Sequence, residues 1–286
     1  MADIHPLTPF HTIVFVAHGG PLEAKSALLA ASLSINYVPK KISCCLMEPL
    51  SRWGKISTET ELLFDQLGIS THYARNEVDE SYPHGNKIAS MAPIDGPALF
   101  LDSDVLLMKP LSWNYQLCSD FASKPADLDT YTRGGGQWSA VYDLFDLHIP
   151  PRNYNATTTG EMMRPYFNAG VISVKNGRAF TDIWVEASQK IDSSDLILNK
   201  RPWLDQISLP VAIDLLGWET TPLTEKFNYP CHIEALKNSS PYFAHYHRPH
   251  IIKNDPLLHK EFSMLTRLFP SLKTIMSKYE EWNVLL

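Results

Sequence analysis

A short apolar run leads directly into two acidic residues at Ala98-Leu99-Phe100-Leu101-Asp102-Ser103-Asp104. Four consecutive apolar residues predict a buried strand, and the two carboxylates follow at its carboxyl end. Open α/β sheets bind their ligands at that end of the strands. Two acids one residue apart repel each other, and each raises the pKa of the other unless a cation neutralises them. The run therefore predicts an α/β fold with a cation site, although a strand entering an acidic surface turn has the same pattern.

The residues before this run alternate between strand and helix patterns. Thr12–Ala17 has the composition of a buried strand, and Leu22–Leu33 is an Ala- and Leu-rich helix. A second helix is predicted to begin with a capping box at Thr58 and to end at Gly68, followed by a strand over Ile69–Tyr73. Such alternation is typical of a largely parallel sheet flanked by helices.

The residues after Asp104 lose this regularity for a time. A polar, aromatic-bearing stretch around Gly134-Gly135-Gly136 predicts a long loop or lid. Regular patterns then return, and the last helical one should break at Pro270. The segments expected to be ordered are Tyr166–Val174, Phe180–Lys190, Asp205–Leu216 and Leu257–Trp282.

The composition is that of a folded protein whose main partner is not nucleic acid. The chain has 286 residues, 44% hydrophobic and 20% charged, which excludes disorder and coiled coil. A chain of this length buries roughly 75% of its unfolded surface, so it needs no disulfide or structural metal. Its formal charge of −6 opposes binding to a phosphate backbone. No repeat or linker divides it, which predicts a single domain.

The cysteines and the N-terminus favour a cytoplasmic location. None of the four cysteines has the spacing of a zinc or redox site: Cys44, Cys45, Cys118 and Cys231. The first residues, Met1 to Pro6, lack the basic and apolar regions of a secretory signal. Apolar runs such as Ile13 to Ala17 are far shorter than the ~20 residues that span a bilayer.

The C-terminal helical segment combines basic and aromatic side chains. Such a mixture permits weak peripheral contact with an anionic membrane surface. Packing of its apolar stripe into the core is the favoured alternative, because acidic residues dilute the positive charge. The residues concerned are Lys260, Arg267, Lys273 and Lys278, with Phe262, Phe269 and Trp282.

Three further motifs follow the acidic pair in order. They are Tyr166-Phe167-Asn168-Ala169-Gly170-Val171, Pro202-Trp203-Leu204-Asp205-Gln206 and His245-Tyr246-His247. With these, the chain resembles the GT-A glycosyltransferases over roughly residues 12–255, and most of all the retaining family that includes glycogenin and the bacterial lipopolysaccharide galactosyltransferases. That family has a strand ending in Asp-x-Asp, then Phe-Asn-Ala-Gly, then a helix opening with Asp-Gln, then a late His followed six residues on by Lys.

The resemblance implies a GT-A fold, with a Rossmann-like, mixed and mostly parallel central sheet flanked by helices. We expect a single domain over residues 1–286. Residues 12–110 would form the nucleotide-binding half, and residues 111–255 the acceptor-side half with the metal and phosphate loop. Residues 256–286 would form a C-terminal helical segment.

The resemblance also implies a divalent metal held by Asp102, Asp104 and a late histidine. His247 preserves the spacing to Lys253, whereas His245 better copies the local His-aromatic sequence and remains the alternative. Carboxylate ligands suit Mg²⁺ or Mn²⁺, and an added imidazole favours Mn²⁺.

Two residues are expected to act at the sugar carbon. That carbon becomes oxocarbenium-like as its bond to phosphate breaks, so a nearby amide oxygen or carboxylate stabilises it. By resemblance, Gln206 would be an electrostatic helper and Asp205 would bind sugar hydroxyls. An ordinary helix N-terminus is the competing interpretation of both, because the helix dipole favours Asp there.

The remaining donor contacts follow from the same resemblance. Lys253 would bind the phosphates, Ser103 lies within the acidic motif, and Lys87 matches a basic donor-contacting position. Small residues let a ligand approach the backbone closely. The donor sugar would be lined by Asn168, Ala169 and Gly170, and the base and ribose would face Ala17, His18 and Gly19.

The predicted function is metal-dependent transfer of a sugar, with retention, from a nucleotide-sugar donor such as a UDP-sugar. The acceptor can be a glycan, a protein or a small molecule. One rival is an inverting GT-A enzyme with a loop carboxylate as base, for which Glu161, Asp143 and Asp146 are candidates. Another rival is a non-catalytic protein that binds nucleotide sugars.

Overall fold

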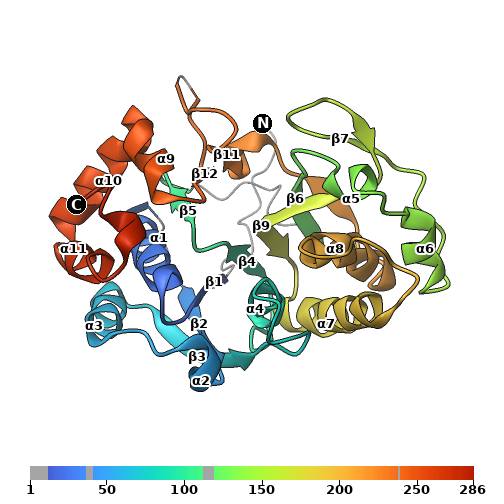
Figure 1. Cartoon of the computed structure of the whole chain (residues 1–286), viewed down its shortest axis with the longest axis horizontal. Helices are drawn as coiled ribbons and strands as arrows, with labels where there is room; N and C mark the ends of the chain where they lie inside the picture. The colour runs from blue at the N-terminus through green and yellow to red at the C-terminus, as the bar shows by residue number, and fades with distance from the viewer. Residues whose placement is uncertain (1–11, 37–40, 112–118, 238) are drawn as a thin grey trace, which may run out of the picture.

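Seven strands form the central sheet in the order β10-β6-β9-β4-β1-β2-β3 (Figure 1). The structure is a computed structural model that describes residues 12–36, 41–111, 119–237 and 239–286. The strands are β1 (Thr12–Ala17), β2 (Ile42–Glu48), β3 (Ser70–Arg75), β4 (Ala98–Leu101), β6 (Phe121–Pro125), β9 (Phe167–Val174) and β10 (Thr220–Pro222).

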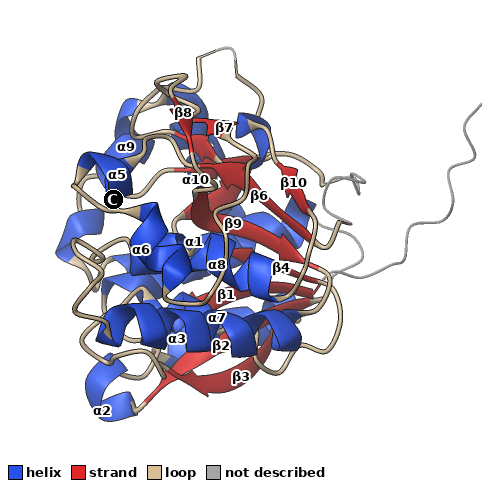
Figure 2. Cartoon of the chain, turned by 90° about the vertical axis from the view of Figure 1, so that its right-hand side faces the viewer, coloured by secondary structure: helices blue, strands red, loops and turns tan. Residues whose placement is uncertain are grey.

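The sheet is mixed and mostly parallel, as predicted. β1 pairs in parallel with both β2 and β4, β2 with β3, and β10 with β6. Only β9 runs the other way in this sheet as described, antiparallel to β4 and to β6. The carboxyl ends of the strands other than β9 therefore lie along one side of the sheet, and the amino end of β9 lies there too. Figure 2 shows their twisted array, from β3 at the bottom towards β6 and β10.

Helices cover both faces of the sheet because strand residues alternate between two cores. In β1, Val14 and Val16 face a cluster that includes α7 (Gly177–Ser193) and α8 (Leu204–Leu215). Ile13 and Phe15 face the opposite cluster, with α1 (Pro21–Asn36) and α3 (Thr58–Leu67). A strand buried on both faces is continuously apolar, which explains the pattern in the sequence.

A smaller sheet adjoins the acidic motif. β5 (Val105–Leu107) directly follows Asp104, β12 (Phe243–His245) pairs antiparallel with it, and β11 (Tyr229–Pro230) pairs in parallel with β12. The short helix α9 (Pro249–Asn254) follows β12.

The C-terminal helical segment packs against α1. α10 (Pro256–Leu268) and α11 (Ser271–Met276) are separated at Pro270, as predicted. Phe262 and Trp282 are buried in one cluster with α1. The apolar stripe of this segment is therefore part of the core, which agrees with the favoured interpretation.

The predicted long loop or lid is wrong for much of its length. The stretch contains β6, α5 (Thr130–Arg133), α6 (Trp138–Asp143), β7 (Tyr154–Asn155) and β8 (Met162–Met163). Tyr131, Trp138 and Tyr142 are buried in the main core cluster. A Cβ atom on Gly136 would lie 2.2 Å from the Tyr131 ring, so this glycine permits close packing.

The helix predicted from Thr58 to Gly68 is confirmed, but its start differs. Gly68 ends it in the left-handed conformation with a φ of 68°. The N-cap residue is Ser57, whose side chain makes no capping bond because its hydroxyl donates to Glu23 of α1. The remaining elements are α2 (Leu50–Trp53), α4 (Gly85–Ala89) and the 3-10 helices η2 (Glu225–Phe227) and η3 (Glu280–Trp282).

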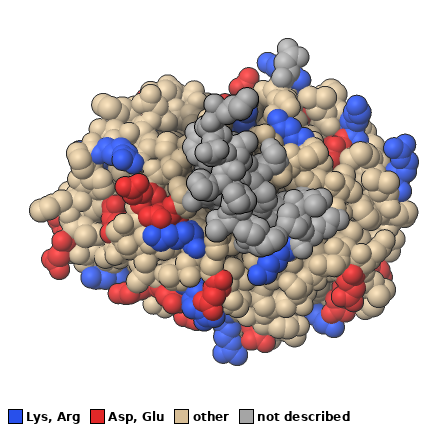
Figure 3. Space-filling model, turned by 180° about the vertical axis from the view of Figure 1, so that it is seen from behind, with Lys and Arg blue, Asp and Glu red and all other residues tan. Residues whose placement is uncertain are grey.

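Charge is interspersed on the face opposite to that of Figure 1. Figure 3 shows basic and acidic side chains alternating along it, and most of its described surface carries neither. Within the described ranges, no helix combines the length and apolar character that crossing a membrane requires. Met1 to Pro6 and Cys118, on which part of the sequence interpretation depends, lie outside the described residues.

Candidate functional site

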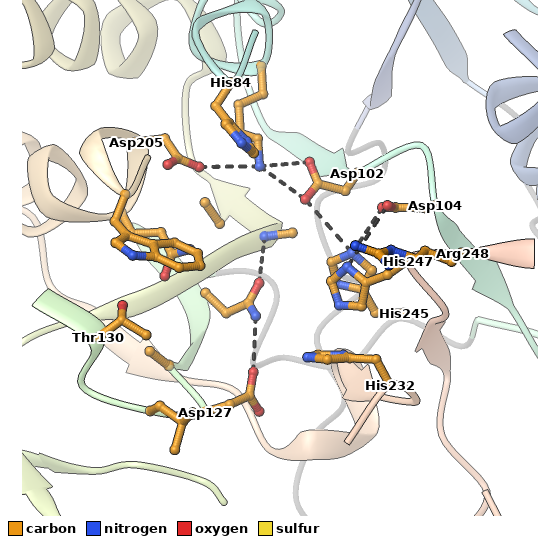
Figure 4. Close-up of a pocket in the computed structure, with 18 of the residues that line it drawn as sticks. His84, Asp102, Asp104, Asp127, Thr130, Asp205, His232, His245, His247 and Arg248 are labelled. Atoms are coloured by element: carbon orange, nitrogen blue, oxygen red, sulfur yellow. Dashed lines mark hydrogen bonds and ion pairs between the residues drawn. The ribbon is translucent and has the colours of Figure 1, made fainter. Parts of the chain in front are cut away.

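A cavity of about 680 Å³ opens at the carboxyl end of β4 (Figure 4). Its walls come from α4, the acidic motif, β9, the start of α8 and the segment after β12. Ten of the residues singled out from the sequence line it: Lys87, Asp102, Asp104, Asn168, Ala169, Gly170, Asp205, Gln206, His245 and His247.

Strand pairing brings these motifs together. The Asp102 amide donates to the Gly170 carbonyl at 2.8 Å, continuing the β4–β9 pairing beyond the last strand residue. On the other side, β12 pairs with β5 so that His245 is opposite Val105, and the Tyr246 amide donates to the Asp104 carbonyl at 3.0 Å. The acidic motif thus lies between β9 of the large sheet and β12 of the small sheet.

Asp104 and both late histidines form one cluster. His245 Nε2 is 2.9 Å from Asp104 Oδ1, and His247 Nδ1 is 4.0 Å from Asp104 Oδ2. The two imidazole rings stack with centroids 3.8 Å apart. Each of the three residues offers a ligand atom within 4.8 Å of the others. Both histidines, treated as alternatives in the sequence, therefore belong to the cluster.

The donor atoms of this cluster fit a divalent cation. A carboxylate and two imidazoles are ligands of Mn²⁺ and related ions, and Asp102 Oδ2 lies 4.0 Å from His245 Nε2. His247 Nε2 is buried and has no hydrogen-bond partner within the described part of the chain. A buried polar atom without a partner is costly, so its presence here is consistent with a ligand in the cavity.

The electrostatics of the cluster favour an ionised carboxylate and a neutral ring. Burial opposes ionisation of Asp104, but His245 and Lys25 outweigh it and hold the pKa of Asp104 well below its usual range. Burial, with His245 next to it, lowers the pKa of His247 to about 2. His247 is consequently neutral at physiological pH and keeps a lone pair for a cation.

Lys87 holds two of the carboxylates. Its Nζ lies 2.9 Å from Asp102 Oδ1 and 3.3 Å from Asp205 Oδ2, in a side chain that is only 11% exposed. Burial would lower the pKa of Lys87, but Asp102 and Asp205 raise it well above its usual range. Asp205 also accepts a hydrogen bond from the Tyr82 hydroxyl at 2.9 Å. In this structure Asp102 is thus engaged mainly by a lysine.

Asp205 and Gln206, at the start of α8, both line the cavity. Asp205 is in the first turn of α8, and Gln206 follows it on the cavity wall. Asp205 is buried, whereas Gln206 is half-buried.

The glycine of Asn-Ala-Gly has a neighbour that the sequence did not predict. A Cβ atom on Gly170 would lie 2.7 Å from Cε1 of His245. The small residue therefore makes room for a histidine ring, in addition to lining the cavity.

Five predicted donor contacts do not line this cavity. Ala17 and His18 line a separate, much smaller hollow beside Gly54, and Gly19 packs directly on Gly54. The Ser103 hydroxyl donates to a carbonyl of β1, and Lys253 is exposed on α9. The loop carboxylates considered for an inverting mechanism are also exposed and outside the cavity: Asp143, Asp146 and Glu161.

Several residues that line the cavity were not predicted from the sequence, and Asp127 is one of them. It follows β6, whose carboxyl end lies at the same sheet edge as that of β4. The strand itself was hidden, because Phe121-Ala122-Ser123-Lys124-Pro125 lacks an apolar run. Other cavity residues that were not predicted have no distinctive local pattern, among them His84, Thr130, His232, Arg248 and His250. Trp203 lies in the motif that contains Asp205 but was given no role there.

Comparisons with known proteins agree with this geometry. The model of a family described as "Rhodobacterales glycosyltransferase domain" matches residues 13–217. No curated protein matches the chain in sequence.

Among solved structures, the galactosyltransferase LgtC with donor and acceptor sugar analogues is 15% identical, with a TM-score of 0.51. The match covers 96% of this chain and 99% of that one. An active-site mutant of LgtC matches at 16% identity, with the same coverage and a TM-score of 0.51. At this identity the likeness shows the fold, and that fold is GT-A.

Proposed function

The chain belongs to the Rhodobacterales glycosyltransferase domain family, and from that premise we propose that it is a metal-dependent, retaining enzyme with a UDP-sugar donor. The observation that carries the proposal is the cluster of Asp104, His245 and His247 at the end of β4. In the proposed reaction, a nucleoside diphosphate leaves with more negative charge than it had in the donor, so the site must stabilise that charge.

Asp104, His245 and His247 would hold the cation, with Asp102 beside them. Two imidazoles in the set favour Mn²⁺ over Mg²⁺. When bound, the cation supplies Lewis-acid stabilisation of the departing phosphates. Arg248 lines the same cavity and adds a positive charge from the protein itself.

The donor sugar is proposed to lie between Asp205, Gln206 and β9. Lys87 pairs with Asp205 at 3.3 Å and orients its carboxylate, which can accept hydrogen bonds from sugar hydroxyls. Gln206 lines the cavity beside it and can place its amide oxygen near the sugar carbon as positive charge develops there.

Retention is supported by the state of the cavity carboxylates. Four carboxylates line the cavity among the described residues, and each already has a cationic or imidazole partner: Asp102 and Asp205 have Lys87, Asp104 has His245, and Asp127 has Lys124. An inverting mechanism needs a carboxylate free to take the proton of the acceptor. Attack from the face that the phosphate leaves does not need one.

The proposal extends to donor, acceptor and location. LgtC is described as a galactosyltransferase, which makes a UDP-hexose the first donor to test. The acceptor can be a glycan, a protein side chain or a small molecule. We propose a cytoplasmic location, in keeping with the free thiols of Cys44, Cys45 and Cys231. We also keep residues 1–286 as one domain, with the cavity between residues 12–110 and 111–255.

The test is release of nucleoside diphosphate from a panel of nucleotide sugars with Mn²⁺, with Mg²⁺ and with EDTA. We expect turnover with Mn²⁺ and none with EDTA. Asp104→Asn should lower kcat/KM at least about 100-fold, because a ligand and a charge are lost at the departing phosphates. Asp143→Asn, an exposed aspartate outside the cavity, is the matched control and should leave kcat/KM unchanged.

Two results would contradict the proposal. Binding of nucleotide sugar without turnover, across the acceptor classes named, would indicate a non-catalytic binding protein. A product of inverted anomeric configuration by proton NMR would leave a glycosyltransferase but remove retention.

A further inference from the structure

A chain of hydrogen bonds runs behind the cavity wall from Lys124 to His245. Lys124 is fully buried and pairs with Asp127. Asp127 Oδ2 accepts from Asn168 Nδ2 at 3.2 Å, a contact drawn in Figure 4, and Asn168 Oδ1 accepts from Asn228 Nδ2 at 2.9 Å. Asn228 Oδ1 lies 3.1 Å from His245 Nδ1. Each member therefore restricts the orientation of the next.

The donor and acceptor of each hydrogen bond in this series are fixed by groups that can only donate or only accept. The Asp127 carboxylate, paired with Lys124, can only accept, so the nitrogen of the Asn168 amide must face it. The Gly170 backbone amide can only donate, and it donates to Asn168 Oδ1 at 2.9 Å. Both ends of the Asn168 side chain are thus assigned by their neighbours.

The orientation of the Asn168 amide in turn fixes the orientation of the Asn228 amide and the position of the ring hydrogen of His245. Asn168 Oδ1 has no hydrogen to give, so Asn228 must present its nitrogen to it and its oxygen to His245. An amide oxygen can only accept, and His245 Nδ1 must consequently carry a hydrogen. Asn228 is 1% exposed, so bulk water cannot take its place.

We propose that Asn228 is a positioning residue that keeps the ring hydrogen of His245 on Nδ1 and directs the Nε2 lone pair to the cation beside Asp104. His245 Nε2 lies 2.9 Å from Asp104 Oδ1, and a cation bound beside Asp104 would take the place of the hydrogen that this contact uses. Asn168 and Asp127 act through Asn228. Groups that fix the tautomer of a metal-bound histidine typically change metal affinity ~10–100-fold when removed.

This inference rests on the proposed function, because it assumes the cation. The first experiment measures the Kd of Mn²⁺ alone, from the electron paramagnetic resonance signal of free Mn²⁺. Asn228→Leu removes the acceptor at similar size, and we expect it to weaken Mn²⁺ binding ~10–100-fold. Asn228→Asp retains an oxygen facing His245 Nδ1 but sets its other oxygen against Asn168 Oδ1, so it should bind Mn²⁺ more tightly than Asn228→Leu and less tightly than wild type.

The matched control is Asn86→Leu. Asn86 is also buried, and its amide has no hydrogen-bond partner among the described residues. The same substitution there should leave the Mn²⁺ affinity unchanged. Circular dichroism and urea unfolding confirm that each variant is folded.

The outcomes separate this inference from the proposed function. A wild type that binds no Mn²⁺ overturns both. A wild type that binds Mn²⁺ while Asn228→Leu binds it equally well overturns only the inference. Equal weakening in Asn228→Leu and Asn228→Asp indicates a packing role and also overturns it.

The second experiment needs no variant of Asn228 and stands if that variant does not fold. Metal-free wild-type protein with ¹⁵N-labelled histidine is measured by long-range ¹⁵N–¹H NMR, and His245→Gln identifies the resonances. We expect a hydrogen on Nδ1 of His245, whether or not Nε2 also carries one for Asp104 in the absence of the cation. An Nδ1 without a hydrogen overturns the inference.

Discussion

At the scale of single residues, Lys87 is the group on which the acidic side of the site depends. It is the shared partner of Asp102, which is 20% exposed, and of Asp205, which is 2% exposed. Two carboxylates held at a cavity wall repel each other unless a cation is fixed between them. A lysine with a raised pKa provides that cation before any ligand binds.

We expect Lys87→Met to destabilise the fold as well as abolish turnover. Removing one partner of a largely buried ion pair costs about 3 kcal/mol of unfolding free energy, since the other charge stays without compensation. Urea unfolding at pH 7 measures this. The matched control is Lys55→Met, where an exposed lysine pairs with Glu61, and there the loss should be below about 1 kcal/mol. Equal losses in the two variants would mean that Lys87 has no special role.

At the scale of elements, the site is a junction between β9 of the large sheet and β12 of the small one. Gly170 on β9 and His245 on β12 are in such close contact that a methyl group does not fit between them. The position of the imidazole is therefore set by the separation of two strands.

This contact predicts that Gly170→Ala weakens Mn²⁺ binding. The added Cβ would displace the His245 ring from Asp104, and we expect the affinity to fall ~10-fold or more. Isothermal titration with Mn²⁺ measures the change, alongside urea unfolding to show that the sheet is intact. A native-like variant with wild-type affinity would show that the ring adapts to the methyl group.

At the scale of the whole molecule, Glu23 joins the two ends of the described chain. This buried carboxylate on α1 accepts hydrogen bonds from the Ser57 amide at 2.7 Å, from the hydroxyls of Ser57 and Thr60 before and in α3, and from the Tyr279 hydroxyl near the C-terminus. Burial opposes its ionisation, but these donors outweigh burial and lower the pKa of Glu23.

Glu23→Gln should lower the unfolding free energy by about 2 kcal/mol at pH 7, because bonds to a charged acceptor are lost. The folded-state pKa lies below the unfolded value of about 4.3, so this stabilisation is complete above that pH and disappears as the pH falls through the folded pKa. The difference between wild type and variant should therefore shrink below about pH 4.

Urea unfolding from pH 3.5 to pH 7 measures that trend. Glu234→Gln, at an exposed glutamate, serves as the control and should track wild type throughout. A difference for Glu23→Gln that stays constant with pH would mean that shape and not charge is responsible.

The local patterns of the chain were sufficient for the α/β class and for the acidic pair, whereas the resemblance to GT-A glycosyltransferases supplied the other predicted residues that line the cavity. An apolar run ending in Asp102 and Asp104 predicts a buried strand with a ligand at its end, and the alternation before it predicts a parallel sheet. These follow from sequence because burial on two faces and hydrogen bonding along a strand act on neighbouring residues. β6 was not predicted because its buried polar residues interrupt the apolar pattern. Ser123 donates to the Asn168 carbonyl, and Lys124 pairs with nearby Asp127 and donates to the Thr157 hydroxyl.

Only the tertiary structure decided which side chains act together. It placed His245 beside His247, engaged Asp102 with Lys87, and set Ala17–Gly19 apart from the cavity. His245 reaches Asp104 across 141 positions of chain through the pairing of β12 with β5. Register and packing between distant segments depend on the whole set of contacts, so no local pattern encodes them.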